Sequence, residues 1–183
     1  MLNNVRVSSC GWDGLSVYGE GSSVEVLESR FEENLHHGID VWDGGRLDVR
    51  KSRCTLNGLT GMVIMSREID SLVQQCVVDR NREVGIAISN GARVTLRSNR
   101  ATSNLLGGFS VEGEGTAVIM EGNIAEKTPR AGSVGDRRST VKSYEKNTAK
   151  GNQGAQEQLK ADLPEPVVPN DPIPPAFEAP PPK

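Results

Sequence analysis

The sequence has few aromatic residues and few large apolar side chains. Aromatic residues make up 4% of its 183 residues and hydrophobic residues 36%, which argues against a large globular core packed around rings. No apolar run approaches the roughly 18 residues that a membrane-spanning helix needs, so we expect no membrane partner. Residues 1–6 hold no apolar stretch of the signal-peptide type. The cytoplasm is therefore the default location, and an extracytoplasmic location would require a truncated N-terminus.

The sequence also lacks an excess of charge of one sign. It has 21 Lys and Arg against 24 Asp and Glu, a net charge of −3, and the two signs are mixed along the chain. A nucleic-acid-binding protein needs a basic stripe, so we expect no nucleic-acid partner. The three cysteines are an odd number and their spacing fits no zinc pattern. We therefore expect neither a metal site nor a cofactor.

Glycine is abundant, with 20 residues, and much of it belongs to an internal repeat. The pattern Gly-apolar-x-apolar recurs at separations of 24, 23, 24 and 23 residues, beginning at Gly14, Gly38, Gly61, Gly85 and Gly108. An asparagine lies four residues before each of the last four glycines: Asn34, Asn57, Asn81 and Asn104. Two further sets of apolar residues follow the same period. Five matching columns at one period indicate a repeat architecture.

The spacing of the apolar residues predicts strands. Each apolar pair is spaced i, i+2, so alternate side chains point to the interior. Three short strands in 23 to 24 residues, without a helix-period segment, predict a parallel β-helix of about five coils. Successive coils stack at about 4.8 Å, so each inward position becomes a ladder of like side chains. The recurrent asparagines predict a structural ladder whose amides bond to the coils above and below.

The composition changes toward the C-terminus, and it predicts three segments. Residues 1–127 form the β-helix domain, because Pro129 and the polar run after Gly132 offer no further inward columns. Residues 128–163 are predicted to be a polar linker, mostly irregular. Residues 164–183 hold nine of the ten prolines and are predicted to be a disordered, Pro-rich tail.

Both tryptophans and both histidines fall on outward positions of the first two coils. Aromatic faces beside carboxylates and imidazoles suit a sugar-binding surface, because flat apolar rings pack on pyranose rings while polar groups bond to hydroxyls. The predicted ligand-binding residues are Trp12, Asp13, Tyr18, His36, His37, Asp40, Trp42 and Asp43. The alternative is that the rings shield the strand edge or face further coils upstream. No residue is assigned a catalytic role, because Asp40 and Asp43 start on opposite faces of a strand.

The repeat resembles the right-handed parallel β-helix repeat family, the pectate-lyase-like superfamily with carbohydrate-binding and sugar-hydrolase repeats. The clearest copy is residues 26–41, VLESRFEENLHHGIDV, and the resemblance covers about two thirds of the chain. It implies a right-handed β-helix, but it is poor evidence for function, because relatives include lyases, glycosidases, epimerases and protein scaffolds.

These observations favour a non-catalytic module that binds an extended polysaccharide on its first-coil face. Two alternatives stay open. One is a protein-interaction scaffold, in which the aromatic patch packs against another chain, against upstream coils or against a second copy through the N-terminal coil. The other is the C-terminal fragment of a polysaccharide lyase, glycosidase or epimerase-like enzyme.

Overall fold

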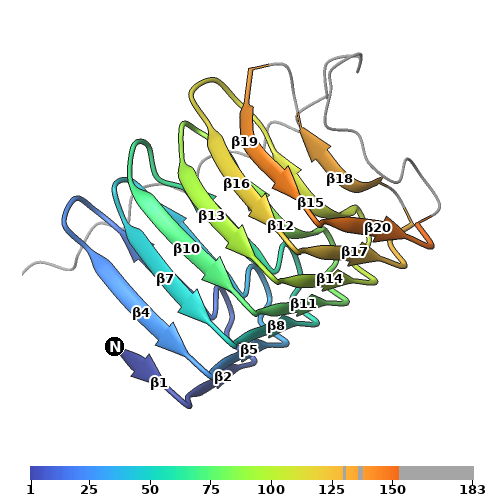
Figure 1. Cartoon of the computed structure of the whole chain (residues 1–183). Coiled ribbons are helices and arrows are strands. Elements are labelled where there is room, and N and C mark those ends of the chain that lie inside the picture. Colours follow the sequence, from blue (N-terminus) through green and yellow to red (C-terminus); the bar gives the residue numbers. More distant parts are fainter. Residues whose placement is uncertain (130, 136–137, 153–183) are drawn as a thin grey trace, which may run out of the picture.

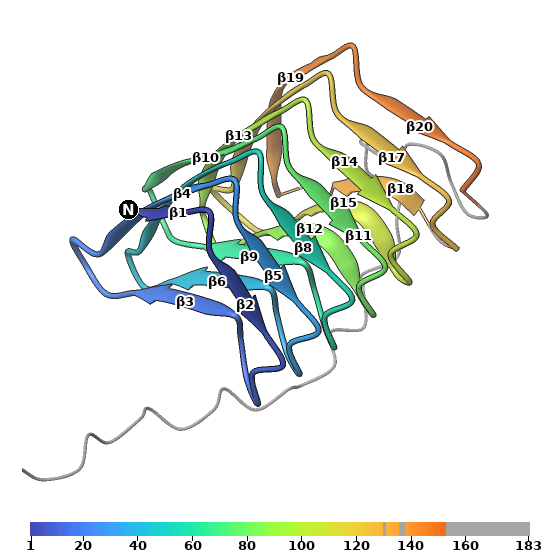
Figure 2. The same cartoon turned by 90° about the horizontal axis from the view of Figure 1, so that it is seen from below.

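The computed structural model describes residues 1–129, 131–135 and 138–152, and in these residues the chain forms a parallel β-helix. Each coil contributes one strand to each of three parallel sheets, which surround a common interior (Figures 1 and 2). This confirms the all-β solenoid that the glycine repeat predicts. No helix in the described part of the chain is long and apolar enough to cross a membrane.

We name the sheets A, B and C, in the order in which a coil enters them. Sheet A comprises β1 (Leu2–Asn3), β4 (Ser23–Leu27), β7 (Arg46–Arg50), β10 (Asp70–Gln74), β13 (Arg93–Arg97), β16 (Ala117–Glu121) and β19 (Thr140–Glu145). Sheet B comprises β2 (Arg6–Ser8), β5 (Arg30–Glu32), β8 (Arg53–Thr55), β11 (Val77–Asp79), β14 (Arg100–Thr102), β17 (Ile124–Glu126) and β20 (Thr148–Lys150). Sheet C comprises β3 (Leu15–Tyr18), β6 (Ile39–Trp42), β9 (Met62–Met65), β12 (Val84–Ile88), β15 (Gly107–Val111) and β18 (Ala131–Gly135).

The core forms because alternate residues of each strand point inward. In β7, Leu47 and Val49 are fully buried, whereas Arg46 and Arg50 on either side are exposed. The parallel register then aligns like residues of successive coils. One such column of buried side chains in sheet A is Val26, Val49, Val73, Leu96 and Met120. A single coil cannot bury its own apolar face, so stability arises from the stacking.

Buried asparagines link the coils at the turn between sheets B and C. Asn57 accepts hydrogen bonds at Oδ1 from the main-chain N–H and the Nδ2 of Asn34, at 3.1 and 3.0 Å. Its own main-chain N–H and Nδ2 donate to Oδ1 of Asn81, and Asn81 donates in the same way to Asn104. Each amide thus satisfies main-chain groups that the turn would otherwise bury without partners.

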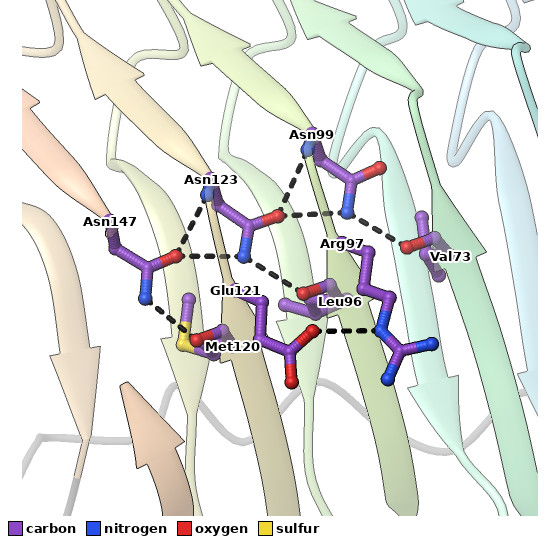
Figure 3. Close-up of polar contacts among 8 residues, drawn as sticks. All are labelled: Val73, Leu96, Arg97, Asn99, Met120, Glu121, Asn123 and Asn147. Atoms are coloured by element: carbon purple, nitrogen blue, oxygen red, sulfur yellow. Dashed lines mark hydrogen bonds and ion pairs between the residues drawn. The ribbon is translucent and has the colours of Figure 1, made fainter. Parts of the chain in front are cut away.

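A second asparagine ladder lies between sheets A and B, and the repeat of Gly-apolar-x-apolar with its preceding asparagine does not predict it. Oδ1 of Asn123 accepts from the main-chain N–H and Nδ2 of Asn99, and Oδ1 of Asn147 accepts both bonds from Asn123 (Figure 3). The spare amide protons go to the main-chain carbonyls of Val73 and Leu96. The signal is present in the sequence, since these asparagines are 24 residues apart.

The strands continue beyond residue 127, where the sequence predicts the end of the stack. Three more strands follow, β18, β19 and β20, and each pairs with the strand of the preceding coil. The prediction of a mostly irregular linker over 128–163 is therefore wrong for residues 131–135, 140–145 and 148–150. Pro129 lies in the turn, where it interrupts no strand, and Thr128 continues the asparagine ladder by donating to Oδ1 of Asn152. The predicted Pro-rich tail, 164–183, lies outside the described residues.

Candidate functional site

The predicted site residues lie at the N-terminal end of sheet C, on β3, on β6 and in the turns beside them (Figure 2). The register pairs Ser16 with Asp40 and Tyr18 with Trp42. Val17 and Val41, between them, are buried in the core, so these four side chains lie on the outer face of the sheet. We call this surface the sheet C face.

Two pairs of rings stack across the first two coils. The centroids of Tyr18 and Trp42 are 4.9 Å apart with their planes at 13°, and 57% and 39% of these residues are exposed. Trp12 and His36, in the turns that precede the strands, have centroids 3.6 Å apart. The spacing of the first pair matches that of the coils, so each ring partly covers a face of its neighbour. Among the described strands, β3 with Tyr18 is at the edge of sheet C, and it pairs with β6 through Tyr18 and Trp42.

A column of polar side chains runs up the turns beside these rings. Oδ1 of Asp13 accepts the main-chain N–H of His37 at 2.9 Å, and Nδ1 of His37 accepts the main-chain N–H of Thr60 at 3.2 Å. The Thr60 hydroxyl donates to Glu83 at 2.9 Å. We call Asp13, His37, Thr60 and Glu83 the turn column. Its side chains tie coil to coil as the asparagines do, and Thr60 and Glu83 are members that the sequence-based site lacks.

The turn column fixes the state of His37. Because Nδ1 accepts a hydrogen bond, the proton of the neutral ring resides on Nε2. Burial lowers the pKa of His37 below its ordinary value of 6.5, and the nearby charges of Asp13 and Glu83 oppose this only in part. His37 is therefore neutral at pH 7, with Nε2–H as its remaining donor.

Asp40 is the most perturbed acid on the sheet C face. Burial, followed by the charge of Asp13, raises its pKa from 3.8 to about 7, although a hydrogen bond from the main chain of Val41 partly offsets the effect. Its Oδ1 is buried and has no hydrogen-bond partner. Near neutral pH the carboxyl group is therefore present in both protonation states, and it can donate to or accept from a ligand.

The stability of the protein should depend on pH through Asp40. The folded state holds this proton more tightly than the unfolded state, so stability falls as pH rises from about 4 to about 7. Asp40→Asn keeps the shape but does not ionise. We expect urea denaturation to show the variant more stable than the parent by up to roughly 2 kcal/mol at pH 8, with no gain at pH 4.

The titration of His37 does not confuse this comparison. The lowered pKa of His37 reduces stability as pH falls below 6.5, but it does so equally in parent and variant. If parent and variant differ in their free energy of unfolding by the same amount at pH 4 and at pH 8, then Asp40 has an ordinary carboxyl pKa.

Asp43 has a different role from the other predicted residues. It lies in the turn after β6, is exposed, and has a left-handed backbone with φ of 50°. Aspartate tolerates this conformation better than most residues, which explains its presence there. Asp13, in contrast, also accepts the hydroxyl of Ser16 at 3.1 Å, so it joins the turn column to the sheet C face. Within the described residues, no three His, Cys, Asp or Glu side chains are arranged to hold a metal ion.

Comparison with known proteins identifies the fold. The sequence profile described as "Right handed beta helix region" matches residues 1–154. Among solved structures, the periplasmic alginate epimerase AlgG has a TM-score of 0.67 and 17% sequence identity over 80% of this chain. A mutant of AlgG gives 0.66 and 18%, and the A-module of the Azotobacter vinelandii mannuronan C-5 epimerase AlgE6 gives 0.38 and 15% over 88% of this chain.

This chain matches only part of each of these enzymes. The match spans 39% of the AlgG chain, 36% of its mutant and 56% of the AlgE6 module. No curated protein matches the sequence significantly.

Proposed function

The chain belongs to the right-handed β-helix family, and on that basis we propose that it is a non-catalytic module that binds an extended polysaccharide along the sheet C face of its first two coils. The observation that carries the proposal is the stacked and exposed pair Tyr18 and Trp42 beside Asp40. The exposed parts of the two rings offer apolar contact for a sugar, and Asp40 offers hydrogen bonds to hydroxyl groups.

The site also has the shape that a linear polymer requires. Sheet C is a row of six parallel strands, so its outer face extends along the stack without a break in the main chain. The Tyr18–Trp42 pair and the turn column both follow the direction in which the coils stack, and not the direction of the strands. The fold neighbours include an enzyme named for alginate, a polysaccharide, and this is consistent with a glycan on a β-helix surface.

A second candidate function, a protein-interaction scaffold, is favoured by exposed leucines. Four of them lie in the turns between sheets B and C: Leu35, Leu56, Leu105 and Leu106. Trp12 is also exposed in a turn of this kind. Exposed apolar patches of this kind often bind other proteins. A third candidate, a fragment of an epimerase-like enzyme, is consistent with the raised pKa of Asp40, which suits proton transfer.

Intrinsic fluorescence can test the proposal, because Trp12 and Trp42 are the only tryptophans and both lie at the site. We expect a soluble polysaccharide to change the emission saturably, with a Kd of about 1 mM. Trp42→Ala should weaken this response at least tenfold, since it removes half of the ring stack. Its stability should fall by only about 1 kcal/mol, because the ring is partly exposed.

The matched control is Leu105→Ala, an exposed leucine in the turn before β15 and three coils away from β6, which should leave glycan binding unchanged. The absence of any response across acidic, neutral and basic polysaccharides would reject the proposal. A loss of protein partners in Leu105→Ala, without a glycan response in the parent, would support the scaffold. Turnover of the glycan that depends on Asp40 would support the enzyme fragment.

A further inference from the structure

The charged residues are distributed unequally between the sheets. Within residues 1–66, every Lys and Arg lies on sheets A and B or in the turn between them: Arg6, Arg30, Arg46, Arg50, Lys51 and Arg53. The turns and strands of sheet C over residues 9–22, 33–45 and 56–66 contain none. Their charged residues are all acidic: Asp13, Glu20, Glu33, Asp40 and Asp43.

The ion pairs show the same division. In the described part of the chain they lie on sheets A and B or in the adjoining turns, for example Arg50 with Asp48 at 2.9 Å and Arg93 with Asp70 at 2.8 Å. Among these pairs, none involves Asp13, Asp40 or Asp43. The carboxylates of the candidate site thus have no basic side chain to neutralise them.

We propose that the sheet C face selects glycans that carry free amino groups over glycans that carry carboxylates. This inference rests on the proposed glycan-binding function and names the chemical class of the ligand. A polyuronate would bring its own carboxylates against the charge of Asp13, and it would oppose the ionisation of Asp40, because like charges at a partly buried site repel. An ammonium group instead supplies donors for a charge-assisted hydrogen bond to the carboxylate of Asp40, a half-buried side chain of the sheet C face.

The groups around Asp40 fit this selectivity. Ser16 is its cross-strand neighbour on β3 and Val63 its neighbour on β9, and neither carries a charge. Asp13 is the acid whose charge acts on it, and it lies in the turn before β3. His37, in the turn before β6, is neutral because Nδ1 accepts the N–H of Thr60. A bound ammonium group would therefore meet acceptors and uncharged groups, and it would favour the ionised form of Asp40.

The test compares three oligosaccharide probes of equal length by tryptophan fluorescence: an oligoglucosamine, a neutral β-glucan and an oligogalacturonate. At pH 6 and low salt we expect the oligoglucosamine to bind at least tenfold more tightly than the neutral glucan, and the oligogalacturonate to give no response. Asp40→Asn should remove most of this preference, so that the ratio of the dissociation constants of the neutral glucan and the oligoglucosamine approaches one. Asp48→Asn, on sheet A and paired with Arg50, should leave this ratio unchanged.

The outcomes separate this inference from the proposed function. If all three probes bind equally, the glycan-binding function stands and the selectivity is rejected. If none binds, both fail. An oligolysine that binds as tightly as the oligoglucosamine, and equally well to Trp42→Ala, would show attraction to charge alone and would also overturn the inference. Calorimetry in two buffers adds a readout, since ionisation of Asp40 on binding should release a proton at pH 6.

Discussion

Replacing Gly38 by alanine should destabilise the protein by about 3 kcal/mol or more, because the new methyl group has no space. A Cβ at this position would lie 2.6 Å from the carbonyl oxygen of Gly61, 2.8 Å from Nδ2 of Asn57 and 2.9 Å from Cβ of Cys54. Two of these contacts involve the next coil's main chain and the asparagine ladder, so relieving them requires the coils to separate. In chemical denaturation at equal protein concentration, the soluble Gly38→Ala variant should have a clearly lower midpoint than the parent.

Gly11→Ala provides the matched control. This glycine is in the turn of the first coil, and an added Cβ there would have no neighbour within 4 Å. We expect its stability to stay within about 0.5 kcal/mol of the parent. If the two variants have the same midpoint, then the repeat keeps glycine for a reason other than close approach. If Gly38→Ala does not fold at all, Gly38→Ser will not rescue it, whereas Gly11→Ser will still fold.

The same close approach explains why the glycine register in the sequence predicts the coils so well. At Gly14, Gly61 and Gly85 a Cβ would also lie within 2.7 Å of a carbonyl oxygen of the next coil. One structural requirement therefore repeats every 23 or 24 residues and leaves a strict mark in the sequence. The inward columns follow for a similar reason, because a position that is buried in one coil is buried in the next.

The end of the stack could not be predicted in the same way. The apolar content of the inward columns declines after Lys127, which predicts the end of the stack at that point. Strand pairing, however, uses main-chain groups, and β17 pairs with β20 through residues as polar as Thr148 and Lys150. Asn147 and Asn152 continue the two ladders into this coil. Polar ladders thus extend the β-helix where the apolar columns are weak. In the sequence, Asn147 and Asn152 indicate this further coil.

The candidate site was predictable in its location but not in its chemistry. Counting alternate residues is enough to place Tyr18, Asp40 and Trp42 on one face, because the period of a strand is fixed. The stacking of the rings, the acceptor role of His37 Nδ1 and the buried oxygen of Asp40 depend on side-chain rotamers and on neighbours from other coils. Those neighbours are 23 or 24 residues away, so no local pattern reveals them.

The asparagine ladder leads to the second large expected effect. Asn57 is fully buried, and Asn57→Ala would leave the main-chain N–H and the Nδ2 of Asn34 without their acceptor. The carbonyl oxygen of Phe31 would lose the donor that it has at 3.2 Å. Each orphaned buried polar group costs about 1–3 kcal/mol, so we expect the three together to lower the free energy of unfolding by at least about 3 kcal/mol, measured by urea denaturation.

The ladder also predicts a gradient that a general loss of packing would not produce. Asn34 is the first asparagine of the ladder, and the hydrogen bond that its Oδ1 accepts comes from the main-chain N–H of Cys10. Cys10 is partly exposed, whereas Asn34 is buried. Asn34→Ala should therefore cost about 1 kcal/mol, less than Asn57→Ala, because water can reach the group left unpaired. Arg82→Ala, an exposed change in the turn two coils after Asn34, should be nearly neutral. Equal losses for Asn34→Ala and Asn57→Ala would mean that the cost comes from the removed volume and not from the hydrogen bonds.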